Sequence, residues 1–258
     1  MDSKYILITN DDGITAPGLF ALKQALMGLA PVQVIAPDRN WSASGHAKTM
    51  HRPLRIHPTQ LKDGSAAYAC DGAPSDCVAV ALLGFLATPP ALVVSGINPN
   101  PNVGSDLTYS GTVAAAMEGA LSGVPSIAVS VESTEDFGDY AVAAEYARRL
   151  AARVWREGLT ENTVLNINVP GLPADEIRGI CITRCGKRIY RDELVERIDP
   201  RGKKYYWIGG GKPGGETELE GTDIWALANR MVSITPIRLD MTSHELLERM
   251  APWADALG

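Results

Sequence analysis

The chain has 258 residues, of which 45% are hydrophobic and 21% charged, enough for one domain with a large core. Its formal net charge of -6 excludes the basic surface needed to bind nucleic acid or an anionic membrane, while a small or metal-neutralised anion remains possible as a substrate. No run approaches the roughly 20 apolar residues of a membrane span, so we expect a cytoplasmic protein.

The N-terminal part predicts two strands joined by a helix. Residues 5–9 suit a buried strand, after which the chain enters the polar turn 10–13. The leucines of 17–29 recur at spacings of three and four residues, which predicts a helix opening at a proline. A second apolar run, 32–36, predicts another strand, which leads into the polar loop 37–45.

The middle of the chain predicts a hairpin and then further strands and helices. Within 46–70, apolar residues alternate with arginines, and several prolines and glycines interrupt the segment. This pattern predicts a hairpin with a return strand at 66–70. The apolar run 77–86 predicts a buried helix, and 91–94 the next strand. A long polar loop then leads into an alanine-rich helix at 112–121.

Strands and helices continue to alternate as far as residue 182. We expect strands at 126–131 and 164–169, with an amphipathic helix at 140–155 between them. Sustained alternation of this kind predicts an α/β fold with a doubly wound, mostly parallel sheet.

The C-terminal part is predicted to leave this sheet and return to it. Residues 183–228 are rich in charge, glycine and aromatics, with 205–208 the only strand-like run and no apolar period long enough for a core helix. We therefore expect a core, 1–182 plus 229–258, and a β-rich arm whose aromatics pack on a partner subunit. In the returning part, 232–236 predicts a strand, and a capping box opens a last helix with leucines that can pack on the sheet.

Three predicted loops would open on one edge of the sheet, because the carboxyl ends of parallel strands share the edge where ligands bind. The side chains on these loops are oxygen donors: Asp11, Asp12, Ser42, Ser44, Asn98, Asn100, Asn102 and Asp106. Oxygen ligands without His or Cys select a hard divalent cation such as Mg, Mn or Ca over Zn. The helix start Ser110-Gly111-Thr112 would offer backbone N–H groups to a phosphate, so the sequence predicts metal-assisted hydrolysis of a phosphate ester.

Each of these features also has a plain structural interpretation. Adjacent aspartates favour a turn and the start of the following helix. Ser110 or Thr112 could be an ordinary N-cap. The convergence of three loops on one edge is what favours a site.

Several motifs stand in order along the chain: Asn10-Asp11-Asp12-Gly13, Ala36-Pro37-Asp38 with Ser42-Ala43-Ser44-Gly45, Gly72-Ala73-Pro74-Ser75-Asp76-Cys77, Ser95-Gly96-Ile97-Asn98 and Tyr109-Ser110-Gly111-Thr112-Val113. Two more follow in the C-terminal part, Asp199-Pro200-Arg201-Gly202 and Glu220-Gly221-Thr222-Asp223. Together they resemble the motif set of the SurE family, the survival-protein-E nucleotidases, over nearly the whole chain. Asn100 stands where the family usually has a glycine.

The resemblance implies a Rossmann-like core and a divalent-metal-dependent phosphatase for nucleoside 5'- and 3'-monophosphates, with short polyphosphate as a further candidate substrate. It also implies a homodimer or homotetramer that exchanges the arm. It places one ion, Mg or Mn with Ca as an inert occupant, on Asp11, Asp12, Ser42 and Asn98. The candidate phosphate and substrate contacts are Asn10, Ser44, Gly45, Asn102, Ser110, Gly111 and Thr112, with Asn10 also expected to brace the loops around the aspartates.

The mechanism expected from these residues is attack of water on phosphorus, with the metal polarising the phosphoryl oxygens and Asp11 or Asp12 accepting a proton. We interpret His46 as an exposed loop histidine, with the transfer of a proton at the site as the alternative role. Two other classes stay open. One is a haloacid-dehalogenase-type phosphatase, whose two aspartates stand two residues apart where these are adjacent, and the other is a non-catalytic nucleotide sensor on the same fold.

Overall fold

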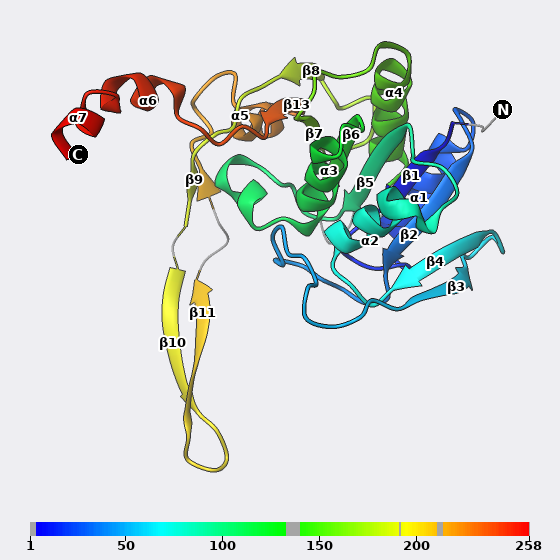
Figure 1. Cartoon of the computed structure of the whole chain (residues 1–258), viewed down its shortest axis with the longest axis horizontal. Helices are drawn as coiled ribbons and strands as arrows, with labels where there is room; N and C mark the ends of the chain where they lie inside the picture. Colours follow the sequence, from blue (N-terminus) through cyan, green and yellow to red (C-terminus); the bar gives the residue numbers. More distant parts are fainter. Residues whose placement is uncertain (1–3, 133–139, 191, 211–213, 258) are drawn as a thin grey trace.

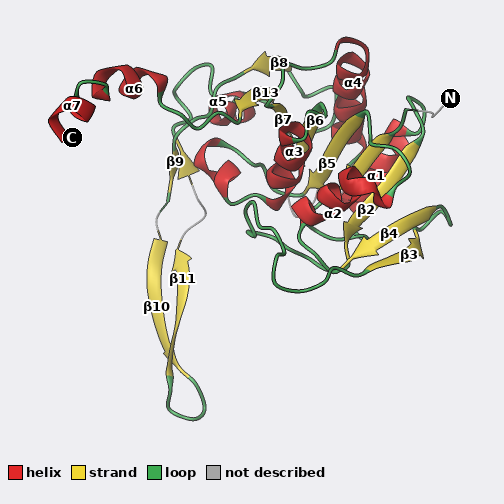
Figure 2. Ribbon diagram, viewed as in Figure 1, coloured by secondary structure: helices red, strands yellow, loops and turns green. Residues whose placement is uncertain are grey.

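The computed structural model describes residues 4–132, 140–190, 192–210 and 214–257. A large sheet carries helices on both faces, and a hairpin and a helical tail extend from this body (Figures 1 and 2). The strands are β1 Ile6–Thr9, β2 Val32–Pro37, β3 Ile56–Gln60, β4 Ala66–Cys70, β5 Leu92–Asn98, β6 Ser126–Val131, β7 Thr163–Val169, β8 Gly179–Ile182, β9 Arg188–Ile189, β10 Asp192–Ile198, β11 Lys204–Gly210, β12 Gly214–Gly215 and β13 Met231–Arg238. The helices are α1 Pro17–Leu26, α2 Pro74–Val80, α3 Gly111–Leu121, α4 Ala141–Glu157, α5 Asp223–Ala228, α6 His244–Met250 and α7 Trp253–Leu257. A π-helical turn spans Ala81–Phe85 and a 3-10 turn Gly104–Thr108.

The main sheet confirms the predicted α/β class. Within the described residues its strand order is β3-β4-β2-β1-β5-β6-β7-β13-β8. Neighbouring strands from β4 to β7 are parallel, while β3 and β13 run antiparallel to β4 and β7. The chain moves outward from β1 to β2 and then returns to the other side of β1 with β5. The crevice between β1 and β5 is therefore the switch point at which α/β sheets bind ligands.

The two faces of the sheet are packed by alternate residues of each strand. Ile6 and Ile8 of β1 belong to the core cluster that includes α1 and α4. Leu7, which points the other way, packs in the cluster that includes α2. Burial on both faces explains why the inner strands read as continuous apolar runs.

Two segments in the first half differ from the sequence prediction. The predicted hairpin at 46–70 is present as β3 and β4, but β4 also pairs in parallel with β2 and so widens the main sheet. The buried helix predicted for 77–86 ends early, because α2 stops at Val80 and the π-helical turn after it contains Gly84 at φ 101°. Leu83 on that turn is 84% exposed, so the prediction of burial is wrong there.

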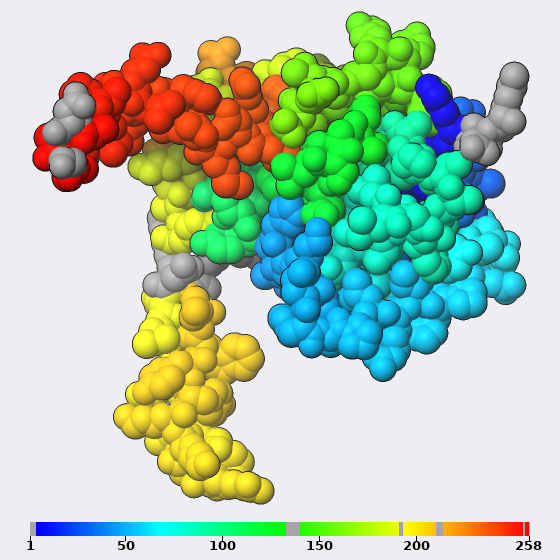
Figure 3. Space-filling view, in the orientation of Figure 1, coloured from blue at the N-terminus to red at the C-terminus, as the bar shows by residue number. Residues whose placement is uncertain are grey.

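The C-terminal arm is a long antiparallel hairpin of β10 and β11 that projects from the body (Figure 3). The sequence pointed to a strand at 205–208 and missed its partner β10. Large apolar side chains on the hairpin stay exposed, among them Leu194, Trp207 and Ile208 at 70%, 64% and 82%. This is a surface that a single copy of the chain does not cover.

Two helices near the end of the chain also differ from expectation. No core helix was predicted within 183–228, yet α5 buries Ile224 and Leu227. At six residues, α5 is too short to show a helical period. The opposite holds for α6, where Leu246 and Leu247 are 44% and 60% exposed and do not pack on the sheet as predicted.

Candidate functional site

The turn after β1 is braced by its own residues. Asn10 is fully buried, its Nδ2 donates to the Gly13 carbonyl at 3.0 Å, and the Gly13 N–H donates back to Asn10 Oδ1 at 3.2 Å. Gly13 has φ 103°, and a Cβ there would lie 3.2 Å from the carbonyl of Arg39. The Trp41 N–H donates to the Asp11 carbonyl at 2.8 Å, which ties the loop after β2 to the same turn. Both side-chain groups of Asn10 are thus used within the protein.

Asp11 sits at the start of α3. Its side chain is almost fully buried, and its Oδ1 accepts a hydrogen bond of 2.5 Å from the Thr112 hydroxyl. Burial raises the pKa of Asp11 above its ordinary value, while hydrogen bonds from the Thr112 hydroxyl and from the backbone of Thr112 and Gly111 offset part of the rise. The donors at this helix start, which were predicted to hold a phosphate, therefore donate hydrogen bonds to the Asp11 carboxylate. Ser110 is an N-cap, since its hydroxyl accepts from the Val113 N–H at 3.1 Å.

The close approach of α3 to Asp11 requires a glycine. A Cβ on Gly111 would lie 2.8 Å from Asp11 Cβ and 3.1 Å from the hydroxyl of Ser44. That hydroxyl is buried and makes no hydrogen bond within the described part of the chain. Gly45, at φ 59°, donates its N–H to the Tyr109 carbonyl at 3.0 Å. Ser44 and Gly45 thus pack the loop after β2 against the start of α3.

Asp12 has different surroundings from Asp11. Burial first, and the charge of Asp11 second, raise the pKa of Asp12 to about 6. The charge of Asp12 adds to the burial that raises the pKa of Tyr140. Asp12 is not among the residues that line the cavity described next. The adjacent carboxylates of the turn are therefore not equivalent.

A cavity of about 470 Å³ opens where the loops meet. Its walls include the predicted residues Asp11, Ser42, Asn98, Asn102 and Ser110. The structure thus brings together side chains from the turn after β1, the loop after β2, the loop after β5 and the start of α3. Arg188 and Tyr190, from β9 and the residue after it, also line the cavity, and neither was predicted as a site residue.

The loop after β5 is anchored through the backbone of Asn102. Its N–H donates to Asn168 Oδ1 at 2.8 Å, and its carbonyl accepts from the amides of Asn166 and Asn168 at 2.8 and 3.0 Å. The Asn102 side chain donates to the Ser130 hydroxyl at 2.8 Å. Asn102 therefore has a structural role in addition to its place on the cavity wall.

The donor set around the cavity fits a hard divalent cation. Asp11, Ser42 and Asn98 supply a carboxylate, a hydroxyl and an amide oxygen. The Asn98 Nδ2 donates to the Asn100 carbonyl at 2.5 Å, which leaves its Oδ1 as the group for a cation. Nowhere in the described ranges do three or more His, Cys, Asp or Glu gather as a metal cluster, so an ion here would depend on Ser and Asn as well as Asp.

His46 connects the loop after β2 to α3. Its Nε2 lies 3.0 Å from Glu118 Oε2, and Lys48 donates to the other carboxylate oxygen at 3.0 Å. The hydrogen bond from His46 is the largest cause that lowers the pKa of Glu118. The exposed position expected for His46 is confirmed.

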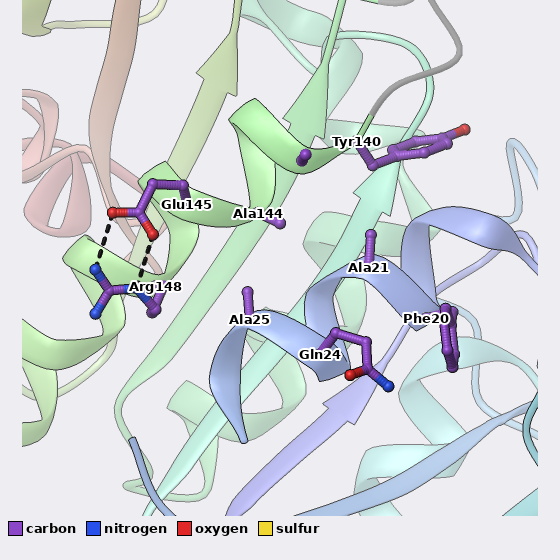
Figure 4. Close-up of a pocket in the computed structure, with 9 residues that line it drawn as sticks. Phe20, Ala21, Gln24, Ala25, Tyr140, Ala144, Glu145 and Arg148 are labelled. Carbon is purple, nitrogen blue, oxygen red and sulfur yellow. Dashed lines mark hydrogen bonds and ion pairs between the residues drawn. The ribbon is translucent and has the colours of Figure 1, made fainter. Parts of the chain in front are cut away.

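A second cavity, of about 560 Å³, lies between α1 and α4 (Figure 4). It is lined mainly by small or aromatic side chains, including Ala21, Phe20 and Tyr140. Its Arg148 donates hydrogen bonds of 2.7 and 2.8 Å to the Glu145 carboxylate. This cavity shares no lining residue with the first and offers no comparable set of oxygen ligands.

Comparison with known proteins gives the family. The model of a family described as Survival protein SurE matches residues 6–192. A relative from Herpetosiphon aurantiacus named 5'-nucleotidase SurE is 52% identical over 254 residues, which cover 97% of this chain and 99% of the relative. This chain belongs to the SurE family. The resemblance inferred from the motifs is confirmed.

Further SurE proteins support the same assignment. One from Chloroflexus aggregans, also named 5'-nucleotidase SurE, is 50% identical, and the match covers 96% of this chain and 98% of that protein. The crystal structure of the SurE protein from Aquifex aeolicus superposes with a TM-score of 0.82 at 40% identity, covering 97% of this chain and 99% of that one. The fold of this chain is therefore the SurE fold.

Proposed function

We propose that this SurE-family chain is a divalent-metal-dependent nucleotidase that hydrolyses nucleoside 5'-monophosphates to nucleoside and phosphate. The observation that carries the proposal is the convergence of Asp11, Ser42 and Asn98 on one cavity at the switch point of the sheet. Relatives about 50% identical over nearly their whole length are named 5'-nucleotidase SurE. Hydrolysis of 3'-monophosphates and short polyphosphate belongs to the same proposal, on the strength of the motifs.

In this proposal Asp11, Ser42 and Asn98 hold one Mg or Mn ion. Asp12, the other carboxylate of the turn, is the fourth ligand that the family motif implies. When bound, the ion supplies Lewis acidity at the phosphoryl oxygens. Thr112 orients the Asp11 carboxylate through its 2.5 Å hydrogen bond. One of the two aspartates accepts a proton from the attacking water. Asn102 and Ser110, on the cavity wall, are the candidate phosphate contacts.

The arm is proposed to join two copies of this chain. Burying the exposed side chains of β10 and β11 against a second subunit would remove a large apolar surface from water. Light scattering of wild type and of Trp207→Ser measures this, and a dimer or tetramer weakened by the substitution is expected. An unaltered monomer in both proteins would contradict it.

No helix in the described ranges has the length and apolar character needed to cross a membrane. The cytoplasmic location expected from the sequence stays a prediction, which cell fractionation tests.

The test of the activity is phosphate release from a panel of nucleoside monophosphates and polyphosphate, with EDTA and with added Mg, Mn or Co. We expect release that EDTA abolishes and an added metal restores. Asp11→Asn should lower turnover at least 100-fold at saturating metal. Asp175→Asn is the matched control, because Asp175 is exposed and lies outside the cavity. Wild-type turnover in Asp11→Asn would refute the assignment.

The same experiment separates the two alternative classes. A phosphoenzyme trapped on Asp11 would identify a haloacid-dehalogenase-type reaction. Metal-dependent nucleotide binding without release of phosphate would identify a sensor. The family assignment favours neither of these outcomes.

A further inference from the structure

One wall of the cavity comes from the root of the arm. Arg188 and Tyr190 lie where the chain leaves the core for the hairpin, far along the sequence from the other lining residues. They line the same cavity as Asp11 and Ser42. A segment expected to serve only in assembly thus contributes side chains to the candidate active site.

This wall is held in place by Asp106. The Arg188 Nε donates to Asp106 Oδ2 at 2.5 Å, and the Tyr190 hydroxyl donates to Asp106 Oδ1. The Arg188 and Asp106 side chains are only 16% and 20% exposed, so water screens their attraction little. Ser105 adds a contact of 3.4 Å to the Tyr190 hydroxyl. Both oxygens of the Asp106 carboxylate are therefore used to position the arm root.

A second carboxylate fastens the same two segments beneath the surface. Asp223 is fully buried, its Oδ1 accepts from the Gly186 N–H at 2.7 Å, and its Oδ2 accepts from the Gly104 N–H at 2.8 Å. The backbones approach so closely that a Cβ on Gly104 would lie 2.5 Å from the Gly186 carbonyl oxygen. The loop after β5 and the arm root are thus joined directly, so the position of Tyr190 is fixed relative to the cavity.

Two aromatic residues that line the cavity are both bonded to Asp106: the Tyr190 hydroxyl donates to its Oδ1, and the Tyr109 N–H donates to its carbonyl at 3.0 Å. Tyr190 is 40% exposed and Tyr109 is 62% exposed, although both line the cavity. Every nucleobase has a face that stacks on an aromatic ring, and such stacking tolerates any base. The cavity of about 470 Å³ falls within the usual range for small-molecule sites, about 300–1,000 Å³.

We propose that Tyr190, with Tyr109, forms the binding site for the base of the nucleotide, with Tyr190 held in place by Asp106. This inference rests on the proposed nucleotidase function and assigns the part of the cavity that the metal ligands leave unexplained. The oxygen ligands hold the phosphate end, and the arm root receives the nucleoside end. The arm then takes part in substrate recognition as well as in assembly.

The test compares two phosphate esters that differ in the base alone, AMP and ribose 5-phosphate, at saturating Mn. Tyr190→Ala should raise KM for AMP on the order of tenfold and lower the selectivity for AMP over ribose 5-phosphate by the same factor. Tyr190→Phe keeps the ring but loses the bond to Asp106, so an intermediate effect is expected. Ile189→Ala is the control, since Ile189 neighbours Tyr190 without lining the cavity and should keep the wild-type selectivity.

Calorimetry with adenosine tests the base site without turnover. Tyr190→Ala should weaken adenosine binding by about the same tenfold. Unchanged selectivity and unchanged adenosine binding would overturn the proposal, and so would an equal loss on both esters. A wild type that binds adenosine through Tyr190 but releases phosphate from neither ester would refute the nucleotidase function and leave the base site standing.

Discussion

Replacing Gly111 by alanine tests whether the close approach of α3 to Asp11 sets the geometry of the site. The new Cβ would lie 2.8 Å from Asp11 Cβ, well inside the 3.4 Å at which ordinary van der Waals contact begins. Asp11 cannot easily yield, because the Thr112 hydroxyl holds its side chain and the Trp41 N–H holds its carbonyl. The turn or the helix start must therefore shift by about half an ångström, the shortfall in that contact.

The expected loss of activity follows from this shift. A misplacement of about 1 Å can cost on the order of 100-fold in rate, so a shift of half that size should lower kcat/KM for AMP on the order of tenfold. The strain of overpacking should lower the free energy of unfolding by about 1–3 kcal/mol. Phosphate release and denaturant unfolding measure the two effects.

Gly28→Ala is the matched control for this substitution. A Cβ on Gly28 would have no heavy atom within 4 Å, so the variant should keep the wild-type activity. The affinity for Mn, followed by thermal shift, should fall for Gly111→Ala alone. A folded Gly111→Ala protein with wild-type kcat/KM and wild-type Mn affinity would refute the reasoning.

Two further predictions concern stability. Leu22→Ala removes a fully buried side chain of α1 and should cost about 2–5 kcal/mol of unfolding free energy, measured in guanidinium chloride; a loss below 1 kcal/mol would mean that the core closes around the gap. The hydrogen bond from His46, with that from Lys48, holds the pKa of Glu118 below its ordinary value, so this carboxylate stabilises the fold above its unfolded pKa and loses that effect as the pH falls through its folded pKa. Melting curves of wild type and Glu118→Gln should therefore differ at pH 6, and the difference should shrink as the pH falls below the ordinary glutamate pKa of 4.5; a constant difference would contradict the assignment.

The sequence predicted best what local patterns encode. The strands at 66–70 and 126–131 have the predicted bounds, because apolar runs that end in turn residues mark strands directly. The meeting of three loops could also be predicted, since parallel strands bring their carboxyl ends to one edge. The helix α6 was predicted from its capping box, but its exposure was not, because a helical period does not reveal what, if anything, the apolar face packs against.

The parts of the site that were missed depend on contacts between distant residues. Arg188 meets Asp106 across 82 positions, and nothing in the local sequence around 188 marks it as part of a cavity. The helix start at Ser110 was correctly placed, but the sequence could not tell that its free donors would serve the carboxylate of Asp11. The signal that could have drawn attention to Tyr190 is its place in the charged part of the arm, ahead of the strand-like run 205–208.

The residues that line the cavity are far apart in the sequence, from Asp11 to Tyr190, so the cavity can be completed only late in synthesis. Thr112 reaches back 101 positions to Asp11, and the arm root closes the cavity only from position 188 onward. A ribosome must therefore release well over two thirds of the chain before the pocket has all its sides. Strands β1 to β7 can pair earlier, so the emerging protein passes through a stage with a folded sheet and an open crevice. The complete cavity therefore forms late in synthesis, at about the time the hairpin is made.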